Sequence, residues 1–159
     1  MEESIKDAQL DRVDMAILRH LQRDGRMSNA ELAEKVNASP ATCHRRTQRL
    51  FADGYISNVR AQIDPQRADR GTLIMIGIVL DRSTPESFAA FEEAVVDLPF
   101  VLDCILVTGD FDFMLKIRAR DMADFKRLWS KHLIVLPGVR QTRTFVAMKE
   151  VIDSAPLDF

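Results

Sequence analysis

Apolar residues recur at helical spacing near the start of the chain, on a stripe formed by Val13, Ile17 and Leu21. Asp11, just before this stripe, carries the short carboxylate that favours a helix N-cap. Gly25 follows the last apolar position and suits the left-handed residue that commonly ends a helix. The pattern therefore predicts a first helix that begins at Asp11 and ends at Gly25.

Two further short helices are predicted where the sequence carries recognisable caps. Ser28 and Glu31 have the spacing of a capping box, and the helix that they start ends near Asn37. Ser39 followed by Pro40 is an N-cap with proline at the first helical position. Two short helices separated by only about three residues are typical of a helix-turn-helix. The inward face of the second of them carries Cys43, Thr47 and Leu50.

An alternating pattern follows Gly54, the residue that ends the third helix. Val59, Ala61 and Ile63 alternate with polar residues, which predicts a strand or β-ribbon. A helix before the helix-turn-helix and a ribbon after it define the winged variant of this motif. We therefore predict a winged helix-turn-helix domain over residues 1–64.

The outward face of the helix that begins at Ser39 has the side chains that DNA recognition requires. Small residues at its start let the backbone approach a duplex, and arginine, glutamine and histidine further along reach base edges in the major groove. Residues 39–60 also hold four arginines against one acidic residue, in a chain whose net charge is only −2. The DNA-contacting residues predicted from this face and its flank are Ser39, Ala41, Thr42, His44, Arg45, Gln48 and Arg49.

The remaining two-thirds of the chain predict a β-α-β-β-α-β order. The polar residues 65–71 are predicted to link two domains. Helices are predicted after Ser83 and Asp121, each with an apolar stripe. The order is that of a ferredoxin-like sandwich, predicted here over residues 72–159. Its four strands are predicted at residues 73–80, 100–107, 111–118 and 139–148.

The fold class that follows is α+β, a winged helix-turn-helix joined to the ferredoxin-like sandwich. Both helices of such a sandwich cover one face of the sheet and leave the other face open. Burial of that open face against a second copy favours a homodimer.

Composition and motifs narrow the range of functions. Apolar residues make up 47% of the chain and charged residues 29%, which is typical of a soluble globular protein. No apolar run, residues 133–137 included, is long enough to span a membrane, and the N-terminus lacks the apolar segment of a signal peptide. We therefore expect a cytoplasmic protein in which Cys43 and Cys104 are free thiols. The sequence contains no familiar metal-binding, phosphate-binding or nucleophile motif, so we expect no metal, cofactor, membrane partner or catalysis.

Two sets of short motifs stand in order along the chain. The N-terminal set lies at residues 10–14, 24–32 and 50–56, and the more specific C-terminal set at 107–113, 136–139 and 142–144. Together they resemble the Lrp/AsnC family of transcriptional regulators, the feast/famine regulators. The resemblance covers residues 10–151 and is closer to the leucine-responsive branch of the family.

The resemblance implies a transcription factor that binds double-stranded DNA through its winged helix and dimerises through its second domain. It also implies that dimers assemble further, often into octamers, and that a free amino acid bound between dimers changes assembly or DNA affinity. Leucine, another apolar amino acid or proline are the leading effectors. Thr47 departs from the family, whose members often have an aliphatic residue there, so the operator and target genes are not carried over. The effector-binding residues implied are Gly109, Asp110, Asp112, Leu136, Thr142 and Thr144.

The residues themselves support such a site but leave alternatives open. Gly109 lets the backbone come close to a ligand, and Asp110 and Asp112 suit an α-ammonium group. The same two acids also suit an ordinary hairpin turn, in which they satisfy nearby N–H groups. For the whole protein, the alternatives are a winged helix that docks onto protein, and a tetrapyrrole decarboxylase of the same architecture that uses His132 and Arg143.

Overall fold

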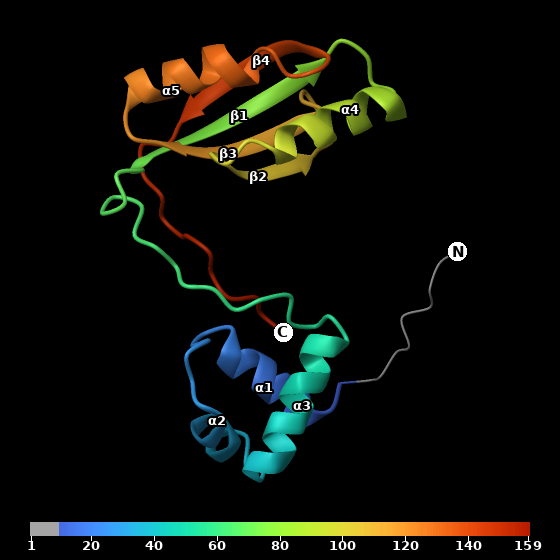
Figure 1. Ribbon diagram of the computed structural model, residues 1–159, viewed down its shortest axis with the longest axis vertical. Coiled ribbons are helices and arrows are strands. Elements are labelled where there is room, and N and C mark those ends of the chain that lie inside the picture. Colours follow the sequence, from blue (N-terminus) through green and yellow to red (C-terminus); the bar gives the residue numbers. More distant parts are fainter. Residues whose placement is uncertain (1–9) are drawn as a thin grey trace. The chain divides into compact units, whose positions relative to one another are not determined.

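The computed structural model describes residues 10–159, so the prediction about a signal peptide concerns residues that lie outside the described part. The described residues form two compact units (Figure 1). The first comprises residues 10–62 together with Ile152–Phe159, and the second comprises Ile63–Val151. The domain boundaries drawn from the sequence stay predictions. They did not anticipate that the C-terminal residues pack with the first unit.

Three helices build the first unit, and each begins at the cap that the sequence predicts. They are α1 (Arg12–Leu21), α2 (Asn29–Lys35) and α3 (Pro40–Ala52). The side chains of Asp11, Ser28 and Ser39 accept hydrogen bonds from backbone N–H groups of the first turn of their helices. The helix-turn-helix is therefore confirmed. Its core includes Ile17, Leu32, Ala33, Cys43 and Leu50.

The predicted ribbon after α3 is not formed within this chain. Among the described residues, the one sheet contains four strands, all of them in the second unit. A ribbon requires a second strand alongside it, and Val59 and Ile63 stay 51% and 68% exposed. The prediction of a strand at residues 59–63 is wrong for the single chain, because no partner strand is present to satisfy its backbone.

Gly25 does not have the left-handed, helix-ending conformation that the sequence predicts. Its φ is not positive, and α1 already ends at Leu21 with Gln22 as its C-cap. A Cβ at position 25 would lie 2.7 Å from Cγ1 of Val59. A side chain here would require Val59 to move, because the segment after α3 packs closely against the turn that follows α1.

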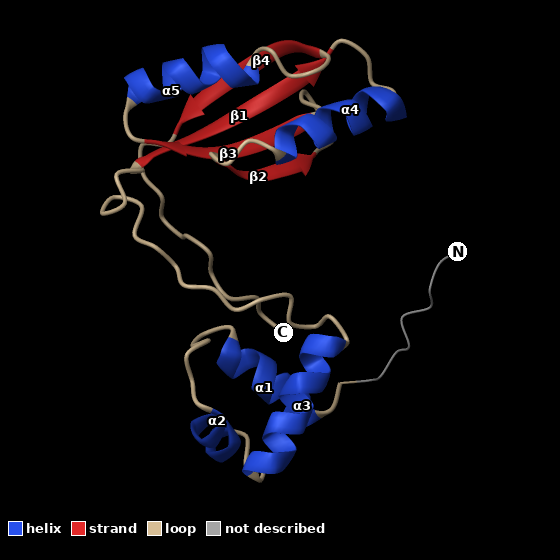
Figure 2. Cartoon of the chain, in the orientation of Figure 1, coloured by secondary structure: helices blue, strands red, loops and turns tan. Residues whose placement is uncertain are grey.

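The second unit is a four-stranded antiparallel sheet with two helices on one face (Figure 2). The strand order β2-β3-β1-β4 is that of the predicted ferredoxin-like sandwich, so this part of the fold is confirmed. The elements in chain order are β1 (Thr72–Leu80), α4 (Pro85–Val96), β2 (Val101–Leu106), β3 (Phe113–Ala119), α5 (Met122–Leu128) and β4 (Val139–Val146).

Alternation along the central strands separates the helix-covered face from the open face. Ile76 on β1 pairs with Leu115 on β3, and both are fully buried beneath the helices. Phe113 stacks on Phe91 of α4 with 4.6 Å between ring centroids. Lys116, which points the other way, is only half-buried on the open face. This contrast explains how the sheet leaves one face available to a second molecule.

A π-helical turn that the sequence pattern does not predict extends α5. It spans Trp129–Leu133 and leaves Leu133 fully buried. The indole Nε1–H of Trp129 donates a hydrogen bond to Oγ1 of Thr142 on β4 at 3.1 Å. Turns of this kind are frequent at functional sites, and this one lies against one of the predicted effector residues.

Candidate DNA-binding and ligand-binding sites

Helix α3 presents most of its predicted DNA-contacting side chains to solvent. Ala41, His44, Arg45 and Gln48 are all exposed, while Cys43 and Leu50 are fully buried on the opposite face. This arrangement follows from the 100° rotation per residue of a helix and leaves Arg45 free to extend. The structure gives Arg45 the position that the contact with DNA requires, and the contact itself stays a prediction.

The two hydroxyl residues at the start of α3 are already engaged in capping. The Ser39 hydroxyl donates to Oγ1 of Thr42 at 2.9 Å, and the Thr42 N–H donates to Oγ of Ser39 at 3.2 Å. These bonds fix the first turn of the helix and its exposed backbone N–H end. Such an end attracts a phosphate group, which agrees with the predicted contact between the start of α3 and DNA.

A buried carboxylate on α1 holds two arginines of α3. Asp14 is 1% exposed and accepts hydrogen bonds from Nη1 of Arg46 at 3.0 Å and Nη2 of Arg49 at 2.6 Å. Nη1 of Arg46 also donates to Asp11 at 2.5 Å. We call Asp11, Asp14, Arg46 and Arg49 the α1–α3 ion cluster. This cluster holds the recognition helix against α1 and so fixes the orientation of α3 within the first unit.

The same cluster perturbs the titration of Asp11. The backbone N–H of Asp14 and, next, the guanidinium of Arg46 lower the pKa of Asp11 from the usual 3.8 to about 2. Both groups favour the ionised carboxylate. Asp11 therefore stays charged at neutral and mildly acidic pH, and it serves at once as N-cap of α1 and as partner of α3.

Sequence reasoning missed this cluster and assigned Arg49 to the flank that meets DNA. The signal was present in part, since Asp11 and Asp14 have capping-box spacing and that capping box is formed. Arg46 and Arg49 lie one turn apart on α3, but their partner is more than thirty residues away in the chain. Arg49 as a DNA contact stays a prediction, now with its guanidinium already paired.

The predicted effector hairpin lies between β2 and β3. Gly109 has a φ of +120°, a conformation that side chains disfavour, and Asp110 is exposed. The carboxylate of Asp112 accepts the backbone N–H of Leu80 at 2.8 Å and the hydroxyl of Ser83 at 3.2 Å. Asp112 thus holds the hairpin against the end of β1, which is the structural role that the sequence left open for it. Asp110 keeps a free approach from solvent.

The structure brings the hairpin and β4 to the same end of the sheet. Ile78 of β1 pairs with Phe113 on one side and with Thr142 on the other. Thr144 lies two residues further along β4, opposite Ile76. Leu136, also predicted as an effector residue, is buried in the core beneath the helices at 8% exposure. Asp112 and Thr142 therefore lie at the same end of the sheet as the hairpin that carries Gly109 and Asp110, whereas Leu136 is part of the core.

Phe111 belongs to this region, and the sequence analysis did not single it out. Its ring lies on the open face of the sheet above Gly77, where an added Cβ would come within 2.5 Å of the ring. Phe145 on β4 meets the ring edge at 6.2 Å between centroids, and the Arg143 guanidinium lies 5.8 Å from its centroid. A lone glycine inside a buried strand is the signal that marks such a close approach. Phe111 ties the hairpin to the face expected to dimerise.

Within residues 10–159, no group of three or more histidine, cysteine, aspartate or glutamate side chains is placed to hold a metal ion. None of the helices in this same range is both long and apolar enough to cross a membrane.

Family models match both units. A model described as the AsnC-type helix-turn-helix domain matches residues 10–50, and one described as the Lrp/AsnC ligand binding domain matches residues 73–157. A helix-turn-helix with an exposed recognition helix, joined to an α+β ligand-binding domain, defines a DNA-binding transcriptional regulator. The chain belongs to the Lrp/AsnC family of such regulators. This family consists of regulators and not enzymes, which decides against the decarboxylase alternative.

Individual relatives agree with this assignment. The leucine-responsive regulatory protein of Escherichia coli strain K12 is 43% identical over 145 residues, which cover 91% of this chain and 88% of the relative. A transcriptional regulator of Neisseria meningitidis, solved with L-Met, has a TM-score of 0.88 and 30% identity, covering 94% of this chain and 96% of that chain. AsnC of Escherichia coli, at 22% identity and a TM-score of 0.81, covers 91% of this chain and 95% of its own and shares the fold.

Proposed function

We propose that the protein regulates transcription in the cytoplasm in response to a free apolar amino acid. The observation that carries the proposal is the pairing of an exposed recognition face on α3 with a ligand-binding domain in one chain. The open face of its sheet, with Phe145 48% exposed, supports a homodimer, and further assembly toward an octamer is proposed by likeness to the family. A two-fold dimer reads two half-sites spaced about 34–36 Å apart, or a multiple of that distance.

The effector is proposed to bind at the end of the sheet that carries Gly109, Asp110 and Thr142. Two relatives support an apolar amino acid, one by its name as leucine-responsive and one by its solved complex with L-Met. Calorimetric titration with each of the twenty amino acids tests the proposal. We expect heat from leucine, another apolar amino acid or proline, and a loss of that heat in Asp110→Ala. Silence across all twenty would overturn the amino-acid response and leave DNA binding untouched.

Arg45 is proposed to read a base rather than a phosphate, because it is exposed on the middle of the recognition face. Replacing Arg45 with alanine is expected to weaken binding to the specific operator by about 1–3 kcal/mol, the value of a bidentate contact with guanine. Binding curves on operator and random DNA, measured at one salt concentration, give the result. Arg45→Lys is the matched control, since it keeps the charge and loses the fork geometry. Equal losses on both DNAs, restored by lysine, would reassign Arg45 to a phosphate.

A further inference from the structure

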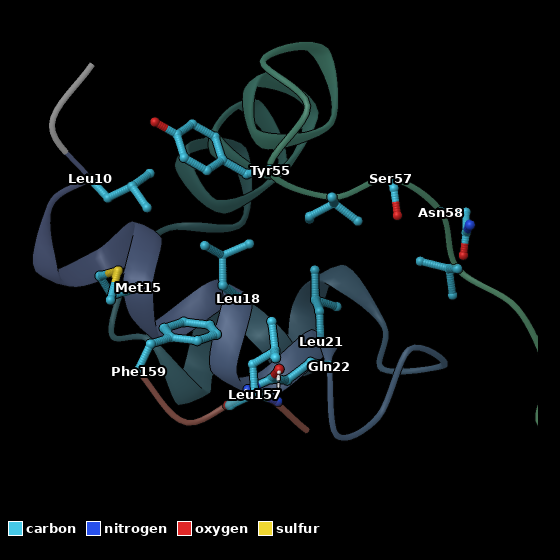
Figure 3. Close-up of a pocket in the computed structure, with 12 residues that line it drawn as sticks. Leu10, Met15, Leu18, Leu21, Gln22, Tyr55, Ser57, Asn58, Leu157 and Phe159 are labelled. Carbon is cyan, nitrogen blue, oxygen red and sulfur yellow. Dashed lines mark hydrogen bonds between the residues drawn. The ribbon is translucent and has the colours of Figure 1, made fainter. Parts of the chain in front are cut away.

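The last residues of the chain return to the first unit and seat against α1. Leu157 and Phe159, which alternate with Asp158, point toward this helix (Figure 3). They line a cavity of about 490 Å³ together with the side of α1 that carries Met15 and Leu18. The remaining lining residues are Leu10, Leu21, Gln22, Tyr55, Ile56, Ser57, Asn58 and Val59.

Two polar side chains of α1 recognise the backbone of this C-terminal segment. The Gln22 amide makes a paired contact with Leu157, in which Nε2 donates to the carbonyl oxygen at 2.8 Å and Oε1 accepts the backbone N–H at 3.0 Å. Nε of Arg19 donates to the backbone oxygen of Phe159 at 2.6 Å, and its guanidinium lies 5.8 Å from the centroid of the Phe159 ring. The Gln22 side chain thereby satisfies both backbone groups of Leu157, as the backbone of a neighbouring strand would in a sheet.

The docked segment uses a different stripe of α1 from the one that holds α3. Met15, Leu18 and Gln22 lie three to four residues apart and face the segment, whereas Asp14 and Ile17 face the core and α3. No residue of α3 lines the cavity. Docking therefore leaves the proposed DNA-reading face uncovered while it contacts the helix to which that face is locked.

We propose that residues 152–159 form a latch, a reversible second connection between the ligand-binding domain and the DNA-binding unit. The first connection is the covalent one at residues 62 and 63. The latch follows β4, the strand that carries the predicted effector residues Thr142 and Thr144, after only a few residues. With the latch docked, the DNA-binding unit is held at two points and has fewer orientations to lose on binding DNA. The consequence for DNA rests on the proposed function, whereas the docking does not.

The contacts are few enough for the latch to open and close. Leu157 remains 75% exposed, so its burial contributes little, whereas Phe159, at 40% exposed, is mostly buried and is the apolar anchor of the segment. The hydrogen bonds made by Arg19 and Gln22 complete the contact. A switch requires two states of similar free energy, because a ligand shifts an equilibrium only by its differential affinity for the two states. A weakly seated segment that follows β4 after only a few residues meets this requirement.

Hydrogen–deuterium exchange of the full-length protein tests the docking, with the Leu157 backbone N–H as the probe. We expect this N–H to exchange about threefold to tenfold faster in Gln22→Ala than in the wild type, as loss of a typical net hydrogen bond requires. Phe159→Ala is expected to give the same acceleration through loss of the second anchor. Asp158→Ala is the matched control, because Asp158 does not line the cavity, and its exchange is expected to match the wild type.

The DNA arm compares operator affinity in the wild type, in Gln22→Ala and in a chain that ends at Asp153. We expect the two variants to change operator affinity by the same factor, because both open one latch. A chain that carries both changes is expected to differ from the wild type by that same factor and no more. Exchange of Leu157 at the free-peptide rate in the wild type would overturn the latch even if DNA binds. Protection that disappears on dilution of the protein would also overturn it, because the occupant would then be a second copy. Protected Leu157 with no DNA binding would instead refute the proposed function and leave the docking intact.

Discussion

Replacing Asp14 with alanine is expected to lower the free energy of unfolding of the first unit by about 3 kcal/mol. Asp14 is 1% exposed and bonds to Arg46 and Arg49 at once. Removal of the carboxylate leaves two guanidinium groups partly desolvated at the α1–α3 contact without their shared anion, and unpaired buried charge is among the costliest defects in a protein. The value lies at the low end for such defects because both arginines keep some contact with water.

Urea unfolding followed by two probes separates this effect from changes elsewhere. Tyr55, the only tyrosine, lies in the first unit, and Trp129, the only tryptophan, lies in the second. We expect the tyrosine transition to move to lower urea and the tryptophan transition to stay in place. Asp53→Ala is the matched control, since the Arg49–Asp53 pair is 3.9 Å apart and exposed, so its loss is expected to change stability by less than about 1 kcal/mol. Equal shifts in the two variants would contradict a special role for Asp14.

The same mutation also bears on function, because the ion cluster sets the orientation of α3. A small helical unit has only a few kcal/mol of stability to lose. Asp14→Ala is therefore expected to weaken operator and random DNA alike, in contrast to Arg45→Ala, which is expected to weaken the operator selectively.

The elements of this fold were predictable wherever a local rule decides them. The caps at Asp11, Ser28 and Ser39 are contacts within one turn of helix, and the alternation along β1 follows from the strand geometry. The β-ribbon was not predictable in the same way, because a strand needs a partner that sequence alternation does not reveal. The π-turn at Trp129–Leu133 likewise depends on how α5 packs against β4, which no local pattern contains.

The candidate sites show the same division. The outward face of α3 follows from helix periodicity, so the exposure of Arg45 and Gln48 was foreseeable. The pairing of Arg49 with Asp14 and of Asp112 with Leu80 links positions more than thirty residues apart, and one sequence does not show such pairs. The docking of Leu157 on Gln22 is the extreme case, at a separation of 135 residues.

Replacing Phe113 with alanine is expected to lower the stability of the second unit by about 3–5 kcal/mol. Phe113 is 1% exposed, stacks on Phe91 and meets the ring of Phe88 edge-on at 5.7 Å. Truncation removes a large apolar surface and both aromatic contacts, and the rigid sheet beneath them has little freedom to fill the cavity. The loss falls on the second unit alone, so Trp129 fluorescence is expected to report earlier unfolding while the first unit keeps its own transition.

Phe113 also immediately follows Asp112, which holds the hairpin against Leu80 and Ser83. Loosening the start of β3 is therefore expected to abolish the heat of effector binding before DNA affinity falls, because α3 belongs to the other unit. Phe113→Leu, which keeps most of the buried volume, is the matched control and is expected to retain effector binding at a smaller loss of stability. DNA binding could instead be lost in parallel with effector binding at temperatures where the first unit remains folded. That result would mean that the second unit is needed for DNA recognition itself. It is the result expected where assembly through the open sheet face sets the half-site spacing.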